Sequence, residues 1–373
     1  MTISKDVLRY DEQAIMNLRT LYRQFGYSQY RTSRFEEYGL YSENKAFLAS
    51  GDIVAFTGVG GKLMALRPDV TLSIVKNVKE SGELKKLCYN ENVYRSDGQE
   101  FKEQMQIGLE CIGDIDIYSM GEVIMLARRS LEILCEDSGM DTKSCIDLSH
   151  MGFITGILQS AKLIPEQSAE ILRLISEKNV PGLNSLCADY GLANEFRERV
   201  AALASLYGPY SETIVKLRQI NANDETNDAL REIEAIYGVL RELRAQQDIN
   251  IDFSIVNDLS YYSGMIFQGY IEGVPSKILS GGRYDKLLRK FGKRSGAVGF
   301  AVYLDLLERL GPPRGGMEID VLLIYGDKTG PIELARAVNS LTASGQSVRT
   351  QRGTGAATLD NAGDISYKRL IRM

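Results

Sequence analysis

The sequence has little of the chemistry that metal and redox sites use. Its 373 residues contain no tryptophan and a single histidine, His150, so neither a histidine-rich metal site nor a chain of proton relays can be assembled. The five cysteines are odd in number, widely spaced and without a CxxC pair, which favours buried thiols over a disulfide framework. His150 stands between two apolar segments, so we expect a structural histidine. We predict no metal ion and no other cofactor.

Long apolar runs and an excess of positive charge are absent as well. No apolar run approaches the ~18 residues that a membrane-spanning helix needs. Residues 1–25 instead have the mixed pattern of an amphipathic helix with charges throughout. The net charge of -5 argues against a basic surface that follows a phosphate backbone. We therefore expect a cytoplasmic protein whose partners include neither a membrane nor nucleic acid.

The chain is long enough for one large core and a smaller unit. Residues 1–310 have the pattern of an α+β domain, interrupted at about residues 151–246 by successive helical patterns without a strand signal. The stretch GPPRGG, residues 311–316, has the composition of a linker. Beyond it, residues 317–373 show the pattern of a small βαβ-like unit.

Glycines cluster in the stretch DIVAFTGVGGKLMALRP, residues 52–68. Two apolar runs flank these glycines, which predicts a tight hairpin. A phosphate-binding loop is the alternative, but its spacing fails because Phe56 stands at the first glycine and Leu63 at the hydroxyl residue. After the hairpin, Pro68 is predicted to open a helix with Asp69 near its N-terminus, where carboxylates are favoured.

The clearest strand is EQMQIGLECIG, residues 103–113. The apolar residues of one parity predict a core-facing side: Met105, Ile107, Leu109 and Cys111. The other parity places an amide, a bare backbone and a carboxylate in a row: Gln104, Gln106, Gly108 and Glu110. That row suits recognition of a small polar ligand, and a half-solvated antiparallel strand is the alternative. Residues 86–97 are its expected hairpin partner.

A second polar stretch is SIVNDLSYYSGMIF, residues 254–267. It reads as a strand that runs through Ile255 into Asn257 and Asp258, followed by the adjacent tyrosines Tyr261 and Tyr262. Such a stretch can line a small-molecule pocket.

Taken in order, these pieces resemble the catalytic domain of class II aminoacyl-tRNA synthetases, specifically histidyl-tRNA synthetase, over roughly residues 5–310. The segments that carry the resemblance are LRPDVT (66–71), YRSD (94–97), QIGLE (106–110), LSYY (259–262), GGRYDKL (281–287) and AVGFAVYLDL (297–306). They are similar to the family's LRPE.T, FRxE, QxGxE, RGLDYY, GGRYDGL and AVGFAxGLER. The resemblance implies a mostly antiparallel sheet flanked by helices, with a helical insertion, usually as a dimer.

The resemblance also implies a pocket for the amino acid. The positions that bind or border histidine in the enzymes are occupied by Asp69, Thr71, Arg95, Gln106, Glu110, Tyr261, Tyr262 and Tyr284. Three of these side chains, Asp69, Gln106 and Glu110, can receive an ammonium group and an imidazole N–H while aromatic rings wall the site. A pocket retained only as inherited packing is the alternative.

The chemistry of the synthetases is not retained with the pocket. Asn257 stands where the family has the arginine of RGLDYY, and Leu306 stands where AVGFAxGLER ends in arginine. Arg309 lies three residues further on and is a poor substitute. Removing one preorganised donor costs roughly 3 to 4 kcal/mol in the transition state, so two losses imply roughly 10⁴-fold or more. The sequence therefore predicts a protein without catalytic residues.

Two neighbouring segments depart from the family pattern too. The stretch between Arg95 and Gln106 is shorter than in the enzymes, and it carries Glu100 and Glu103 where arginine-rich sequence is usual. Asp97 replaces the glutamate that ends the FRxE motif. Ser33, in the stretch TSRFE that resembles motif 1, replaces the usual proline, which weakens the expectation of the familiar dimer.

Residues 317–373 are too few for a complete anticodon-binding domain, the first half of which they resemble. Truncated, catalytically inactive relatives of histidyl-tRNA synthetase form a family of their own, the regulatory subunits of ATP phosphoribosyltransferase. The resemblance implies a non-catalytic subunit that activates the short catalytic subunit, with histidine as the candidate feedback effector. The alternatives are an active synthetase or amino-acid ligase and a stand-alone histidine sensor.

Overall fold

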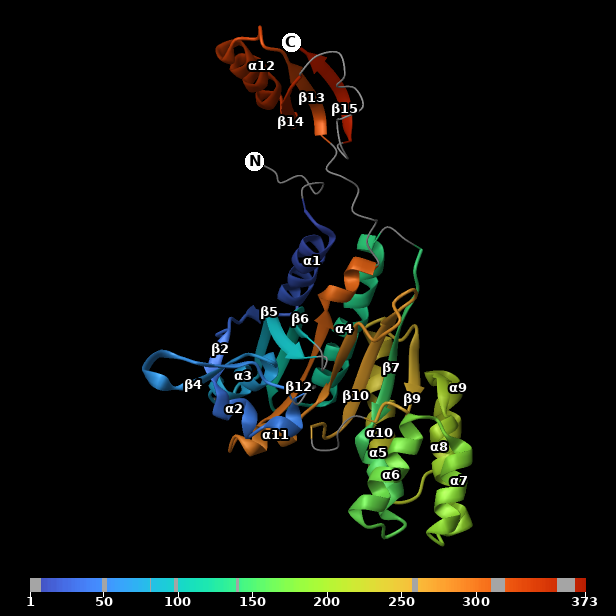
Figure 1. Ribbon diagram of the computed structural model, residues 1–373. Helices are drawn as coiled ribbons and strands as arrows, with labels where there is room; N and C mark the ends of the chain where they lie inside the picture. Colours follow the sequence, from blue (N-terminus) through green and yellow to red (C-terminus); the bar gives the residue numbers. More distant parts are fainter. Residues whose placement is uncertain are drawn as a thin grey trace. The chain divides into compact units, whose positions relative to one another are not determined.

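The computed structural model describes residues 8–48, 52–80, 82–96, 100–138, 141–256, 261–309, 319–353 and 366–373. The chain divides into two compact units, Met1–Leu310 and Gly311–Met373. Figure 1 shows the elements of both units, which are described separately below.

The first unit is built on a nine-stranded sheet. Only the pairs β1–β5 and β7–β9 are parallel, which confirms the predicted, mostly antiparallel α+β fold. Its strands, in spatial order, are β1 (Ser28–Gln29), β5 (Lys85–Ser96), β6 (Phe101–Gly113), β12 (Gly296–Tyr303), β11 (Leu279–Arg283), β10 (Met265–Ile271), β7 (Ser144–His150), β9 (Ile249–Asp252) and β8 (Tyr207–Pro209).

Helices bury both faces of this sheet (Figure 1). On one face, α1 (Tyr10–Gln24) and α4 (Ile117–Ser138) share the main hydrophobic core with Ile107, Leu109 and Cys111 of β6. On the other face, a second core joins the sheet to α2 (Tyr38–Ser42), α3 (Val70–Asn77) and α11 (Asp285–Lys290). The alternative of a half-solvated strand is therefore wrong, because the polar side of β6 is buried as well.

The glycine-rich segment forms the predicted hairpin. Strand β3 (Ala55–Thr57) pairs antiparallel with β4 (Leu63–Leu66), and β4 also pairs with β2 (Phe35–Glu37). The connecting 3-10 turn η3 (Val59–Gly61) contains Gly60 at φ 72°, a conformation that glycine adopts at no steric cost. A second 3-10 turn, η2 (Lys45–Phe47), precedes the hairpin.

Helix α3 begins two residues later than the Pro68 start that the sequence indicates. Asp69 has extended backbone angles and caps the helix, its Oδ1 accepting the Leu72 N–H at 2.8 Å. A side chain that caps a helix satisfies one of the backbone donors left over in the first turn. The Asp69 carboxylate is thus held at the start of α3 by a hydrogen bond from the helix backbone.

The segment between β7 and β9 is mainly helical. It comprises α5 (Met151–Gln159), α6 (Pro165–Ser176), α7 (Val180–Asp189), α8 (Asn194–Ser205), α9 (Tyr210–Gln219) and α10 (Asp224–Glu242). Helix α10 packs on α4 and α5. The expectation of no strand here is wrong, because the short β8 pairs antiparallel with β9. Three residues are too few to show a period-two pattern in sequence.

One strand end also differs from the sequence prediction. Strand β9 ends at Asp252 and does not reach Ile255, because Asp252 Oδ1 accepts the Ser254 N–H at 2.8 Å and closes a turn. Strand β12 leads into the 3-10 helix η4 (Leu304–Arg309).

The second unit contains the predicted βαβ element. Strand β13 (Ile319–Tyr325), helix α12 (Pro331–Ala343) and strand β14 (Val348–Arg352) follow one another, with the two strands parallel. A further strand, β15 (Tyr367–Arg372), pairs parallel with the other edge of β13 and is not anticipated from sequence. Val321, Leu322 and Leu323 of the central strand are buried, so this unit has a small core of its own.

Candidate functional site

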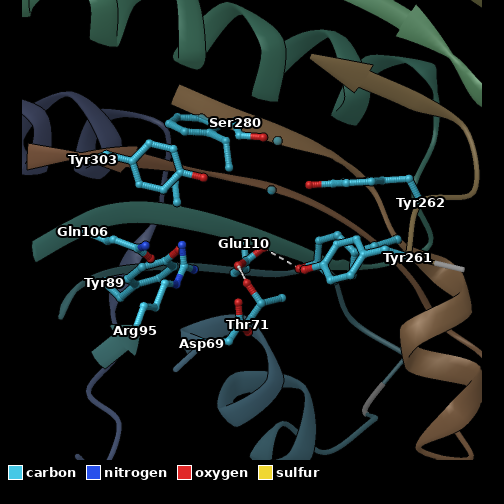
Figure 2. A pocket seen from close by; sticks show the side chains of 15 residues that line it. Asp69, Thr71, Tyr89, Arg95, Gln106, Glu110, Tyr261, Tyr262, Ser280 and Tyr303 are labelled. Carbon is cyan, nitrogen blue, oxygen red and sulfur yellow. Dashed lines mark hydrogen bonds between the residues drawn. The ribbon is translucent and has the colours of Figure 1, made fainter. Parts of the chain in front are cut away.

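The eight predicted pocket residues lie together around one cavity of about 70 Å³. Figure 2 shows it with Arg95 and Gln106 on one side of Glu110 and Tyr261 on the other. The complete lining is Asp69, Thr71, Tyr89, Arg95, Gln106, Glu110, Tyr261, Tyr262, Ser280, Gly281, Tyr284, Gly299, Phe300, Ala301 and Tyr303. The site is thus assembled from α3, the sheet strands β5, β6, β11 and β12, and the segment before β10.

Glu110 lies at the centre of this lining and is only 2% exposed. It accepts hydrogen bonds from the Thr71 hydroxyl at 2.8 Å and from the Tyr284 hydroxyl. Its cross-strand neighbour on β12 is Gly299, where an added Cβ would lie 1.9 Å from Glu110 Oε2. A glycine is therefore required there for the carboxyl group to occupy its place. Burial raises the pKa of Glu110 to about 8.

Asp69 supplies a second carboxyl group from the start of α3. Burial raises its pKa, while the Leu72 N–H and the Arg95 guanidinium act in the opposite direction. The two carboxyl groups lie close enough for the charge of Asp69 to raise the pKa of Glu110 further. This arrangement favours a ligand that brings a positive charge or N–H donors into the cavity.

Arg95, near the end of β5, is the cation of the cavity. Its side chain donates to the Pro68 carbonyl at 3.2 Å and to Gln104 Oε1 at 3.3 Å. Gln104 Oε1 also accepts from Gln106 at 3.2 Å, and its Nε2 donates to Asp305 at the same distance. The polar row of β6 thus extends from the buried Glu110 to the exposed carboxylate of Asp305.

Aromatic rings wall the rest of the cavity. The ring centroid of Tyr261 lies 4.5 Å from that of Tyr262 and 5.9 Å from that of Tyr284. Tyr89, which the sequence reasoning missed, stands opposite Gly108 on β6, where an added Cβ would lie 2.5 Å from its hydroxyl. The period-two pattern of β5 could have found it, because Tyr89 and Arg95 share one parity.

The other missed residues come from β11 and β12. They are Ser280, Gly281, Gly299, Phe300, Ala301 and Tyr303. The glycines in GGRYDKL and AVGFAVYLDL were a usable signal, since a bare backbone at successive strand positions leaves room for a ligand. Cross-strand register, which brings β11 and β12 beside β6, is not readable from one sequence.

A larger chamber of about 360 Å³ adjoins the cavity. The two share Asp69, Arg95, Tyr261, Tyr262, Ser280 and Tyr303, and the chamber adds Ala46, Phe47, Leu48 and Lys277. The Phe47 ring lies 5.8 Å from that of Tyr261. Together the two spaces are suited to a small polar molecule with one end held inside and the other end towards the chamber.

One arginine of the synthetase pattern is replaced by an apolar residue. Leu306 stands at the position of the final arginine of AVGFAxGLER. It packs against the main hydrophobic core. Pairing of β5 with β6 continues to Ser96 and Phe101, so only four residues of sequence separate the paired ends of the two strands. Glu103 is hydrogen-bonded across the hairpin to the Tyr94 hydroxyl at 3.0 Å. Asn257, Asp258 and the Asp97 substitution lie outside the described residues, as does the side chain of Arg309.

His150 ends β7 and is 4% exposed, with its Nε2 atom 3.5 Å from Glu232 Oε2 of α10. His150 is not part of the cavity lining, which fits the structural role expected from sequence. All five cysteines lie in the described part of the chain, and none forms a disulfide. Within those same ranges, no cluster of three or more His, Cys, Asp and Glu residues could hold a metal ion. No described helix is both long and apolar enough to cross a membrane.

Comparisons with known proteins match this architecture. The sequence model of the family described as Histidyl-tRNA synthetase matches residues 5–307. An ATP phosphoribosyltransferase regulatory subunit from Caldanaerobacter subterraneus subsp. tengcongensis is 32% identical, over 77% of this chain and 75% of the relative. One from Oceanobacillus iheyensis is 28% identical, over 80% of this chain and 73% of the relative.

Solved structures show the same fold. An ATP phosphoribosyltransferase regulatory subunit/histidyl-tRNA synthetase from Bacillus halodurans superposes with a TM-score of 0.80 at 24% identity, covering 100% of this chain and 98% of the other. A chain of the ATP phosphoribosyl transferase (HisG:HisZ) complex from Thermotoga maritima has a TM-score of 0.60 at 18% identity, covering 79% and 97%. With its synthetase fold and its match to those relatives, the chain belongs to the histidyl-tRNA synthetase-like family of ATP phosphoribosyltransferase regulatory subunits.

Proposed function

We propose that this chain is a non-catalytic regulatory subunit that binds and activates the short catalytic subunit of ATP phosphoribosyltransferase, in the first step of histidine biosynthesis. The observation that carries the proposal is the environment of Leu306. A partly buried apolar side chain that packs against the main core replaces the final arginine of AVGFAxGLER, while the carboxyl groups of the cavity are retained. A site that keeps ligand recognition without charge stabilisation fits a sensor better than an enzyme.

Regulation of this kind requires only a modest coupling free energy. A subunit whose assembled form binds one state of the catalytic chain more tightly shifts the population of that state. Coupling between an effector site and an active site is typically about 1 to 3 kcal/mol, which corresponds to roughly 5- to 150-fold in affinity. A ligand that orders Tyr261, α3 and β6 around one cavity is a reasonable source of such a difference.

The direct test is reconstitution. The purified full-length chain and a purified short catalytic chain are mixed, formation of phosphoribosyl-ATP is followed, and histidine is titrated. We expect a stable hetero-oligomer by gel filtration. We also expect formation of phosphoribosyl-ATP to depend on this chain and to be inhibited by histidine. Equal activity and equal histidine sensitivity of the catalytic chain alone would leave the stand-alone histidine sensor as the better function.

We further propose that the cavity is the effector site and that histidine is its ligand. Glu110, Asp69 and Gln106 offer acceptors for the ammonium and imidazole N–H groups, and Tyr261, Tyr262 and Tyr284 offer the apolar walls. Thr71 supports Glu110, and Arg95 provides the positive charge. Retention of the pocket as inherited packing is the opposing explanation. It predicts that calorimetry detects no histidine binding that depends on Glu110.

Self-association as a dimer is part of the same proposal. The small sheet of β2, β4 and β3 carries exposed apolar side chains: Phe35 (52% exposed), Phe56, Val59 (99% exposed) and Leu63. The Phe35 and Phe56 rings meet edge to face at 5.6 Å, and Phe35 belongs to the segment that resembles motif 1. Gel filtration of the Phe35→Ser and Phe56→Ser variants tests this interface. We also propose a cytoplasmic location, which the thiol state of the cysteines supports.

A further inference from the structure

Two cations face the chamber beside the cavity, and neither pairs with a carboxylate among the described residues. Arg95 donates to a backbone carbonyl and to an amide oxygen, which are neutral acceptors. Lys277 precedes β11 and has no hydrogen bond or ion pair within the described part of the chain. Its backbone position is fixed because the next residue, Ile278, donates its N–H to the Gly269 carbonyl at 2.9 Å.

Lys277 is partly buried, and its surroundings disfavour its charge. Burial lowers the pKa of its ammonium group, and the positive charge of Arg95 lowers it further. A buried cation is ordinarily paired, because desolvation without a partner is unfavourable. The chamber therefore has a place where an anionic group of a ligand would relieve both the desolvation of Lys277 and its repulsion from Arg95.

The ionisable groups change along the combined space, from a carboxyl group at the inner end to an ammonium group at the outer end. Glu110 lines only the inner cavity, and Lys277 lines only the chamber, while Asp69 and Arg95 line both. A ligand aligned with this gradient has its positive or N–H-bearing end next to Glu110 and its negative end next to Lys277. Free amino acids are zwitterions and have this distribution of charge.

We propose that Lys277, together with Arg95, binds the carboxylate of the effector and makes the site selective for a free amino acid over its decarboxylated or reduced analogues. The inference rests on the proposed effector role of the cavity and names a residue of the site that no motif identifies. Lys277 takes over the carboxylate contact that the replacement of arginine by Asn257 removes. The affinity for histidine is consequently higher than the loss of that arginine alone implies.

The test compares histidine with histidinol, which carries a hydroxymethyl group in place of the carboxylate. Calorimetry is performed on the full-length chain and on the Lys277→Gln, Lys277→Arg and Lys216→Gln variants. Lys216 is an exposed lysine of α9 that lines neither space, so its variant removes the same charge elsewhere. Thermal unfolding of each variant verifies that it is folded.

We expect the natural chain to bind histidine at least about 10-fold more tightly than histidinol, the ratio typical for one charge-assisted hydrogen bond. Lys277→Gln weakens histidine binding by about the same factor and leaves histidinol unchanged, so the preference disappears. Lys277→Arg keeps most of the preference, and Lys216→Gln keeps all of it. This change of selectivity is a result that a merely structural lysine would not give.

Four results overturn the inference. An equal loss for both ligands in Lys277→Gln assigns Lys277 to packing, and an unchanged preference removes it from the site. Binding of pyrophosphate that depends on Lys277, without binding of histidine, makes the chamber a phosphate site. Absence of any ligand binding would refute the effector cavity as well. Activation of the catalytic chain is measured separately, so the regulatory-subunit proposal stands or fails on its own.

Discussion

The inner cavity and the chamber beside it have diverged from the synthetase pattern to different extents. In the cavity, every polar residue that the resemblance placed there is present and lies on the lining, from Asp69 on α3 to Glu110 on β6. Outside the cavity, the position of the final arginine of AVGFAxGLER holds Leu306, which is partly buried against the main hydrophobic core. The strands β5 and β6 remain paired up to Ser96 and Phe101, which are separated by only four residues of sequence.

This difference separates recognition from catalysis in physical terms. Groups that bind a ground-state ligand need only complement its shape and charge, which the carboxyl groups and tyrosines of the cavity do. Groups that accelerate adenylate formation must stabilise charge that develops on phosphate in the transition state. A fold can lose the second set and keep the first, because the two sets lie on different elements around adjoining spaces.

The largest expected effect is the absence of amino-acid activation. We expect no exchange of pyrophosphate into ATP with histidine or any other amino acid, a deficit of roughly 10⁴-fold or more relative to an active synthetase. Asn257→Arg alone does not restore exchange, because Leu306 and the short loop remain. Exchange is measured with radiolabelled pyrophosphate, with an active histidyl-tRNA synthetase as the positive control. Exchange clearly above a buffer blank would contradict the prediction.

The second prediction concerns a substitution in the lining of the inner cavity. In Gly299→Ala, the new methyl group would lie 1.9 Å from Glu110 Oε2 and 2.4 Å from the Leu109 carbonyl oxygen, so the backbone or Glu110 must move. Overpacking of this kind costs roughly 1 to 3 kcal/mol of unfolding free energy. We expect that loss in urea unfolding, together with loss of histidine binding and retention of a folded core.

The matched control is Gly238→Ala on the exposed side of α10, where an added Cβ meets no atom within 4 Å. Alanine is the better helix former there, so this variant is expected to gain about 0.5 to 1 kcal/mol. Histidine binding to Gly299→Ala with natural affinity would show that Glu110 does not define the ligand site.

The sequence predicts the cavity lining better than it predicts the ends of its elements. The polar row of β6 and the glycine-rich segments are local patterns, and they place Gln106, Glu110 and Tyr284 correctly. Tyr303 was missed because it reaches the cavity through cross-strand register, which depends on distant residues. The strand β8 was missed for the same reason, since its partner β9 lies more than 40 residues away in sequence.

Lys277 illustrates a different limit. Nothing in its neighbours Ser276 and Ile278 distinguishes it from a solvated surface lysine in sequence. Only the fold shows that it shares a chamber with Arg95 and Asp69. Charge complementarity between distant segments is a property of tertiary structure, so the part of the site that faces the ligand's carboxylate could not be predicted from motifs.

The third prediction concerns pH and the buried carboxyl group. The folded protein binds the proton of Glu110 more tightly than the unfolded chain does, because its pKa is raised from 4.5 to about 8. The associated stabilisation is fully present below about pH 4.5 and is lost as the pH rises through about 8. Glu110→Gln has no such proton. Its unfolding free energy should rise relative to the natural chain by up to about 1.4 kcal/mol per pH unit across this window.

Urea unfolding at several pH values between 5 and 8.5, on the order of one measurement per half unit, follows this difference. Glu198→Gln, at an exposed position of α8, serves as the control and should show a constant offset from the natural chain. A constant offset for Glu110→Gln as well would mean that the Glu110 carboxyl group is ionised throughout this pH range, so that burial does not raise its pKa.

The smallest expected effect lies at the rim, where Asp305 is exposed and accepts the Gln104 amide at 3.2 Å. Its negative charge opposes a carboxylate that approaches Arg95 and Lys277, although solvent screens most of that repulsion. Asp305→Asn should therefore raise the affinity for histidine by only about two- to threefold at low salt, without changing the affinity for histidinol. The gain should vanish at about 1 M salt, where the Debye length is roughly 3 Å. Asp189→Asn on α7 is the control for removing an exposed carboxylate elsewhere. A gain that persists at high salt would show that Asp305 acts through direct contact with the ligand and not through its charge. Helix η4 would then be part of the binding site.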